Sequence, residues 1–278
     1  MGNTISTYMS AGSDWDGRDA GDGLCVFFYD GGSEFYPGGI GSSLGYTNYR
    51  GPLCYHADTF SDAPWSVATP SNSATDINGI KGAYVGIAFD VKGNFSNTTD
   101  GKLGNNQGTV TTYSGADKVA TNAITQAYPN TIAVRLSEAQ YYKLHSVSDD
   151  LSVFPVASAD RYKHNPPVNL HQTVATKDDV VFTTARVTLQ NKGKRILVEI
   201  KDAATGKFYP YHVADLTSGF ESASNPDTVK AGISFSTSDA FMNCDIRNFT
   251  VQGSIIDKPK ESSKLRPTDG HSFYVDAS

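Results

Sequence analysis

The chain has 278 residues and a formal net charge of −6 at pH 7. This acidic balance, without a basic stripe along any segment, argues against a general nucleic-acid-binding protein. No run of about eighteen apolar residues occurs, so we expect no segment that spans a membrane as a helix.

The chain contains many short apolar or alternating segments separated by turn residues, and almost no helical periodicity. In chain order, the predicted strands are residues 3–10, 24–29, 83–89, 109–113, 131–136, 185–190, 195–201, 208–213, 231–236 and 245–252. Residues 139–145 are compatible with either a short helix or a strand. Residues 191–194 join two alternating segments as a polar turn and indicate a hairpin. We therefore predict an all-β sandwich or barrel.

The segment 81–97, KGAYVGIAFDVKGNFSN, is central to the functional interpretation. Residues 83–89 are small and apolar, which is typical of a strand in the middle of a sheet. Asp90 ends this strand, and Asn94 follows four residues later in a polar loop. Two interpretations stay open: these side chains supply oxygen ligands for a cation or a sugar, or they only cap and turn the loop.

Several segments resemble motifs of the legume-type (L-type) lectins, in the family's order. Residues 21–29, GDGLCVFFY, resemble A-D-G-[LI]-A-F-F-L, and residues 37–46, PGGIGSSLGY, resemble the family's glycine-rich loop. Residues 85–94 resemble the metal-loop strand V-x-V-E-F-D-T-x-x-N, and are more similar still to bacterial and microbial lectin-like variants. Residues 185–197, and residues 231–237 with 245–251, resemble later strands.

The resemblance implies a concanavalin A-like jelly-roll β-sandwich of two antiparallel sheets. It covers residues 1–253 as a single lectin-like domain, and we expect residues 254–278 to form a polar C-terminal tail or arm. The first motif lies closer to the N-terminus than is usual in the family, so the N-terminal strand region is expected to be short or incomplete. Either the chain is a fragment, or the tail or a neighbouring subunit completes the open sheet edge.

The resemblance also implies a carbohydrate site. Its acceptor would be the carboxylate of Asp22, which follows a cis peptide bond in the family, and its donors would be a backbone N–H of Gly39 or Gly41 and the amide of Asn94. Phe95, or an aromatic residue of segment 46–55, would stack on the sugar. A fourth loop, residues 238–243, would tune specificity.

A calcium site is implied at the same end of the sandwich. Asp90, the Lys92 carbonyl, Asn94 and Asp100 match its ligands. However, the first metal carboxylate of the family falls at Ala88, and residues 95–130 contain no histidine. We therefore expect no transition-metal site. Whether the loop binds calcium or no metal stays open, because a lost carboxylate weakens the attraction for a divalent cation.

The first functional hypothesis is a non-catalytic domain that binds glycans or glycoconjugates. The alternative is a structural or decoration protein of a virion or cell-surface assembly, with the lectin sandwich as its scaffold. A glycoside hydrolase is not expected, because no Glu-x-Asp-x-x-Glu arrangement occurs. The N-terminus does not resemble a signal peptide, although the hypotheses imply an extracellular, cell-surface or virion-surface location.

Overall fold

The structure is a computed structural model of the whole chain, and part of the chain is described below. The described residues are 3–10, 20–50, 54–55, 66–67, 76–77, 79–97, 110–114, 117–121, 127–140, 142–152, 165–216, 226–237, 240, 242–253, 267–268 and 272–275.

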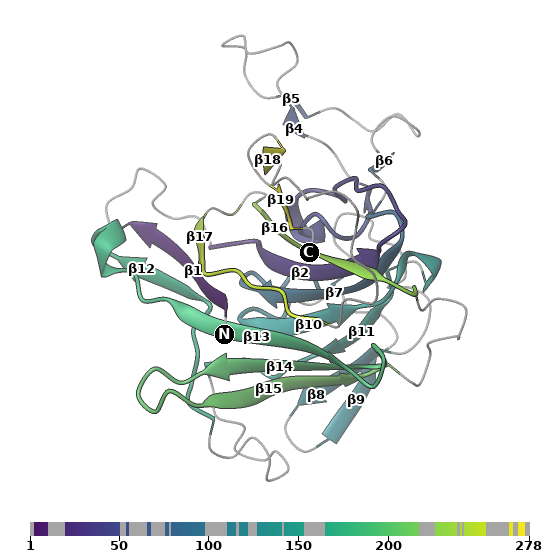
Figure 1. Cartoon of the computed structure of the whole chain (residues 1–278). Helices are drawn as coiled ribbons and strands as arrows, with labels where there is room; N and C mark the ends of the chain where they lie inside the picture. Colours follow the sequence, from purple (N-terminus) through teal and green to yellow (C-terminus); the bar gives the residue numbers. More distant parts are fainter. Residues whose placement is uncertain are drawn as a thin grey trace.

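The larger of two main sheets has nine strands in the order β18-β19-β16-β2-β7-β10-β11-β8-β9 (Figure 1). In chain order these strands are β2 Gly23–Asp30, β7 Ala83–Asp90, β8 Val110–Ser114, β9 Asp117–Thr121, β10 Thr131–Arg135, β11 Leu144–Val147, β16 Val229–Ser236, β18 Pro267–Thr268 and β19 Ser272–Val275. Neighbouring strands are antiparallel except β11 and β8, which are parallel.

The smaller sheet has six strands, with β12-β1-β13-β14-β15 as its main path and β17 paired to β1. Its strands are β1 Asn3–Ser10, β12 His171–Val174, β13 Thr183–Gln190, β14 Arg195–Lys201, β15 Phe208–Asp215 and β17 Asn243–Arg247. Only the β1–β12 pairing in this sheet is parallel. Two further strand pairs join β3 Tyr49–Arg50 to β6 Asp76–Ile77, and β4 Cys54–Tyr55 to β5 Ser66–Val67.

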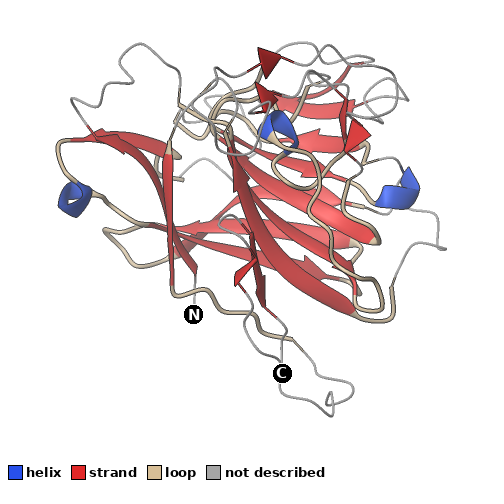
Figure 2. Cartoon of the chain, turned by 90° about the horizontal axis from the view of Figure 1, so that it is seen from above, coloured by secondary structure: helices blue, strands red, loops and turns tan. Residues whose placement is uncertain are grey.

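Helical structure in the described residues is limited to short 3-10 turns. These are η1 Gly41–Ser43, η3 Glu138–Gln140 and η5 Lys177–Asp179. In this part of the chain no helix has both the length and the apolar character needed to cross a membrane. Strands in two layers therefore make up nearly all of the regular structure (Figure 2).

The prediction of an all-β fold with two sheets is confirmed, and the concanavalin A-like jelly-roll connectivity stays a prediction. The hairpin predicted at residues 191–194 joins β13 to β14, with Asn191, Lys192 and Gly193 all at positive φ. Residues 139–145, which were compatible with a short helix or a strand, contain the end of η3 and the start of β11.

Two strand boundaries differ from the sequence-based expectation. The last predicted strand, residues 245–252, ends at Arg247 because Asn248 adopts φ 55, which extended strands do not use. The segment assigned to a polar tail contributes β18 and β19, and β19 pairs with β16 at the edge of the larger sheet. These residues therefore extend the sandwich, at the edge that lies beyond β16.

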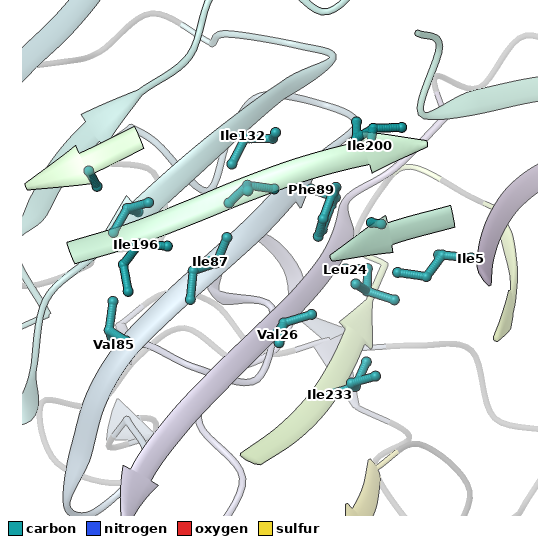
Figure 3. Packing of buried hydrophobic residues seen from close by; sticks show 14 of the residues in the cluster. Ile5, Leu24, Val26, Val85, Ile87, Phe89, Ile132, Ile196, Ile200 and Ile233 are labelled. Atoms are coloured by element: carbon teal, nitrogen blue, oxygen red, sulfur yellow. The ribbon is translucent and has the colours of Figure 1, made fainter. Parts of the chain in front are cut away.

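The core between the sheets is made of aliphatic side chains from both layers. Leu24, Val26, Ile87 and Phe89 of the larger sheet and Ile196 of the smaller sheet belong to one buried cluster (Figure 3). The alternating burial of β14 explains its pattern, because residues 196, 198 and 200 face this core while the residues between them are less buried. This cluster holds the two sheets together.

A second core covers the opposite face of the larger sheet. It contains Cys25, Phe27 and Ala88 from the strands, together with Tyr46 and Phe95 from the loops that follow β2 and β7. The larger sheet is thus buried on both faces, which accounts for the uninterrupted burial of β7. The same packing fixes the loops at the end of the sheet where the candidate site lies.

Tyr46 depends on a glycine in β7. A Cβ atom added to Gly86 would lie 2.6 Å from Cδ1 of the Tyr46 ring. The ring is fully buried, and its hydroxyl donates a hydrogen bond of 2.8 Å to the carbonyl of Leu136. The glycine therefore provides the space that the Tyr46 ring occupies beside the strand.

We expect Gly86→Ala to lower the free energy of unfolding by about 1–3 kcal/mol, because the added methyl group overpacks a site that the Tyr46 ring fills. Urea denaturation measures this change. Gly253→Ala is the matched control, because a Cβ atom there would have no neighbour within 4 Å. Both substitutions lower the conformational entropy of the unfolded chain in the same way. Equal midpoints for the two variants would contradict the packing described here.

Candidate functional site

Strand register brings the predicted site residues to one end of the larger sheet. Gly23, the first residue of β2, lies opposite Asp90 of β7 on one side and opposite Ser236 of β16 on the other. Asp22 directly precedes β2, and Gly41 reaches the same end because its N–H donates to Ser236 Oγ at 2.7 Å. The end of the sheet thus brings together residues from four segments of the chain.

Asp22 is held by its backbone on both sides. The peptide bond between Gly21 and Asp22 is cis, as the resemblance to L-type lectins implies. The Asp22 N–H donates to the Ser236 carbonyl at 2.9 Å, and the Asp22 carbonyl accepts from the Lys92 N–H at 3.0 Å. The side chain of Asp22 is fully buried. Its position is therefore set by β16 and by the loop after β7.

Asn94 meets Asp22 directly. The Asn94 Nδ2 group donates a hydrogen bond to Asp22 Oδ1. Asn94 is only 7% exposed, and its Oδ1 atom has no hydrogen-bond partner among the described residues. A buried amide oxygen without a partner is costly, so this atom is a natural acceptor for a hydroxyl or another donor from a ligand.

The glycine-rich loop does not offer the two predicted backbone donors. The Gly39 N–H donates to the Thr47 carbonyl at 2.7 Å, and the Gly41 N–H donates to Ser236 Oγ. Gly38 and Gly45 are also joined, by a 2.7 Å hydrogen bond from the Gly38 N–H to the Gly45 carbonyl. The loop contacts the site, but a sugar would have to replace existing hydrogen bonds to receive one from Gly39 or Gly41.

Phe95 does not present a face to solvent. Its ring is 0% exposed and lies 6.5 Å from the Tyr46 ring, centroid to centroid, inside the second core. The interpretation of Phe95 as a stacking platform is therefore wrong for this conformation, because the core covers the ring. Tyr46, from the alternative segment, is buried as well, whereas Tyr36, directly before the glycine-rich loop, is 57% exposed.

Asp90 caps the loop that follows β7. Its Oδ1 accepts the Gly93 N–H at 2.8 Å, and its Oδ2 accepts the Ser96 N–H at 3.2 Å. Ser96 adds a hydrogen bond of 2.9 Å from its hydroxyl to the Gly93 carbonyl. These contacts match the capping interpretation of Asp90, while Asn94 points instead to Asp22.

Arg135 is a site residue that sequence reasoning missed. It is fully buried at the end of β10, where its Nε, Nη2 and Nη1 groups donate to the carbonyls of Phe95 at 2.8 Å, Asn97 at 3.0 Å and Tyr142 at 2.9 Å. Burial lowers the pKa of Arg135 to about 9, and the negative charge of Asp90 opposes this shift. The guanidinium is therefore positively charged at pH 7.

The sequence did contain a signal for Arg135. It is the single charged residue in TIAVRL, an otherwise apolar segment that was predicted as a strand. A charge in a strand that is buried on both faces requires hydrogen-bond partners inside the protein. That reasoning identifies an unusual residue, although it does not name the loop carbonyls that receive its hydrogen bonds.

The described members of the predicted calcium site do not fit a divalent cation. Asp90 already accepts two backbone N–H groups, and the positive charge of Arg135 acts on it. Lys92 and Asn94 lie on the same loop, whereas Asp100 lies outside the described residues. Within the described part of the chain, no group of three or more His, Cys, Asp or Glu side chains is placed to hold a metal.

A cavity of about 450 Å³ borders the Lys92 segment. Its polar lining comes from Lys92, Asn130, Asn169 and His171, and Ala20, Val91 and Pro129 supply apolar surface. The two ring nitrogens of His171 are buried without a hydrogen-bond partner among the described residues, and burial lowers the pKa of this histidine. The cavity thus provides open space beside the backbone that holds Asp22.

The predicted fourth loop, residues 238–243, is described only in part. Residues 238, 239 and 241 lie outside the described residues. Ala240 is buried next to Gly21, since a Cβ atom on Gly21 would lie 3.3 Å from the Ala240 Cβ. This loop therefore borders the Asp22 segment.

Comparisons of the chain with protein-family models, with curated proteins and with solved structures found no match. The functional argument therefore depends on the geometry of the site and on the sequence motifs.

We expect Asp90→Asn to lower the free energy of unfolding by about 1–3 kcal/mol. The substitution removes a negative charge near buried Arg135, and it turns an amide NH₂ toward one of the two backbone N–H donors. Chemical denaturation followed by tyrosine and tryptophan fluorescence measures the loss. Asp178→Asn, at an exposed turn, is the control, and a similar small effect for both variants would show that Asp90 has no special structural role.

Proposed function

We propose that the protein is a non-catalytic, carbohydrate-binding domain of the L-type lectin kind, with Asp22 and Asn94 as the polar centre of its glycan site. The observation that carries the proposal is the meeting of these two side chains at the end of the larger sheet, directly joined by a hydrogen bond. Glycans or glycoconjugates present adjacent hydroxyl groups, which need an acceptor such as a carboxylate and an amide that both donates and accepts.

Two features of the surroundings support this role. The loop after β7 carries Asn94 to the carboxylate of Asp22. The Asn94 Oδ1 atom offers a further acceptor.

The burial of the site defines what binding requires. Asp22 is 0% exposed and Asn94 is 7% exposed, so a glycan makes hydrogen bonds to them only if the residues that bury them move. The hydrogen bond between Asp22 and Asn94 then exchanges for hydrogen bonds to sugar hydroxyls. Because one set of hydrogen bonds replaces another, the expected affinity is modest.

The same observations favour a second candidate function, a structural or decoration protein that uses the sandwich as a scaffold on a virion or cell surface. The N–H groups of Gly39 and Gly41 and both carboxylate oxygens of Asp90 are engaged inside the protein. A site closed in this way stabilises the end of the sheet without any ligand. A defined assembly in solution, together with a glycan array without hits, would favour this candidate.

For the glycan-binding proposal we expect Asp22→Asn to weaken binding by about ten- to hundredfold, since hydrogen bonds to a charged group contribute about 1.5–3 kcal/mol. The substitution keeps the side-chain shape and an acceptor for Asn94, but it removes the carboxylate charge. A glycan array identifies a ligand, and titration calorimetry with that ligand measures the change.

The control for this experiment is Asp227→Asn, which changes an exposed aspartate just before β16. Thermal denaturation of both variants checks that the fold is retained. Wild-type affinity in a folded Asp22→Asn protein would rule out Asp22 as the sugar acceptor.

A further inference from the structure

We propose that Arg135 is a built-in cation for the loop 90–97, so that this loop, and the ligand site that includes Asn94, is organised without a divalent metal ion. The resemblance to L-type lectins implies calcium at this loop, and the described residues disagree with that implication. The positive charge comes from the neighbouring strand β10 instead.

The geometry of Arg135 resembles that of an ion inside a cage of oxygens. A calcium ion organises a loop by drawing carbonyl and carboxylate oxygens toward one positive centre. The guanidinium of Arg135 draws in the carbonyls of Phe95 and Asn97 from the loop, and that of Tyr142 from the segment before β11. A planar group with five N–H donors can hold several carbonyls at once, which a lysine ammonium does with less fixed geometry.

The charges around the loop point in the same direction. Asp90 accepts the Gly93 and Ser96 N–H groups, and Arg135 provides an opposite charge in the same buried region. The ring of Phe95 lies 5.2 Å from Arg135 Cζ, so it adds an aromatic face to the surroundings of the cation. A divalent cation placed beside Asp90 would be repelled by this fixed guanidinium.

Arg135 is a positioning residue in this account. It does not reach the Asp22–Asn94 pair in any described hydrogen bond, but it fixes the carbonyls of residues 95 and 97, which follow Asn94 directly in the same loop. The inference rests on the proposed function only for the role of Asn94 in binding. The metal independence of the loop is a property of the protein without ligand, so it is tested separately.

The decisive experiment uses the wild-type chain of residues 1–278 and calcium alone. Protein treated with EDTA is compared with protein in millimolar CaCl₂ by thermal denaturation and by titration calorimetry with CaCl₂. We expect the same thermal midpoint in both solutions and no saturable heat of binding. A midpoint that rises with CaCl₂ and falls with EDTA, or a saturable calcium isotherm, would overturn the proposal. Neither readout needs a glycan, so a failure of glycan binding leaves this result unaffected.

Two variants test whether charge is the property that matters. Arg135→Lys keeps a positive charge, and Arg135→Met keeps a similar length without one. We expect a lower thermal midpoint for both, with the larger loss in Arg135→Met, because only lysine retains a partner for the Asp90 charge. Equal losses, or a smaller loss for methionine, would show that Arg135 acts by packing and would overturn its role as a cation. If neither variant folds, the wild-type calcium measurement decides the question.

The third readout is ligand binding, once the array has identified a glycan. We expect the wild-type affinity to be the same in EDTA and in CaCl₂, whereas a dependence on calcium would overturn the proposal. Folded Arg135→Lys should bind more weakly than wild type, because the turn that presents Asn94 is less rigidly held. Unchanged affinity in that variant would contradict the positioning role of Arg135.

Discussion

The buried guanidinium of Arg135 is the interaction on which this end of the molecule depends. It connects β10 to the loop after β7 and to the segment before β11 through three carbonyl groups. The negative charge of Asp90 favours the charged form of Arg135, so the two opposite charges attract each other across the loop. Arg135 and Asp90 thus belong to one unit with the loop 90–97.

The second core makes this unit rigid. Phe95 packs in that core through its ring while its carbonyl accepts from Arg135, so packing and hydrogen bonding fix the same residue. Asn94 precedes Phe95 and is thereby brought to Asp22. Backbone hydrogen bonds from Asp22 to Ser236 and from Lys92 to Asp22 close the arrangement across β16, β2 and β7. The candidate site is consequently part of the sheet end, and its polar groups are in place before any ligand arrives.

Much of the fold follows from local sequence patterns. The apolar run of β7, the turn at residues 191–194 and the alternation in β14 each have a simple physical reading, and the structure agrees with all three. The parallel pairing of β12 with β1 was not predicted, because it joins segments about 165 residues apart and His171–Val174 has no distinctive periodicity. Completion of a sheet edge by the tail was one of the open alternatives, but the polar residues around β19 did not mark it as a strand.

The candidate site was predictable in position but only partly in detail. The motifs placed Asp22 and Asn94 at one end of the sheet, and their hydrogen bond agrees with that placement. Whether a backbone N–H is available, as at Gly39 and Gly41, depends on tertiary partners that no short pattern specifies. The orientation of Phe95 has the same limitation, because a loop aromatic can face either the core or solvent.

The central claim is that the loop 90–97 is fully organised by the protein's own charges. Amide hydrogen exchange of Gly93 and Ser96, followed by NMR in metal-free buffer, tests it most directly, since both N–H groups donate to Asp90 in the buried loop. The account predicts slow exchange at both amides in EDTA and no further slowing when CaCl₂ is added. Rapid exchange in EDTA that becomes slow only with calcium would contradict it.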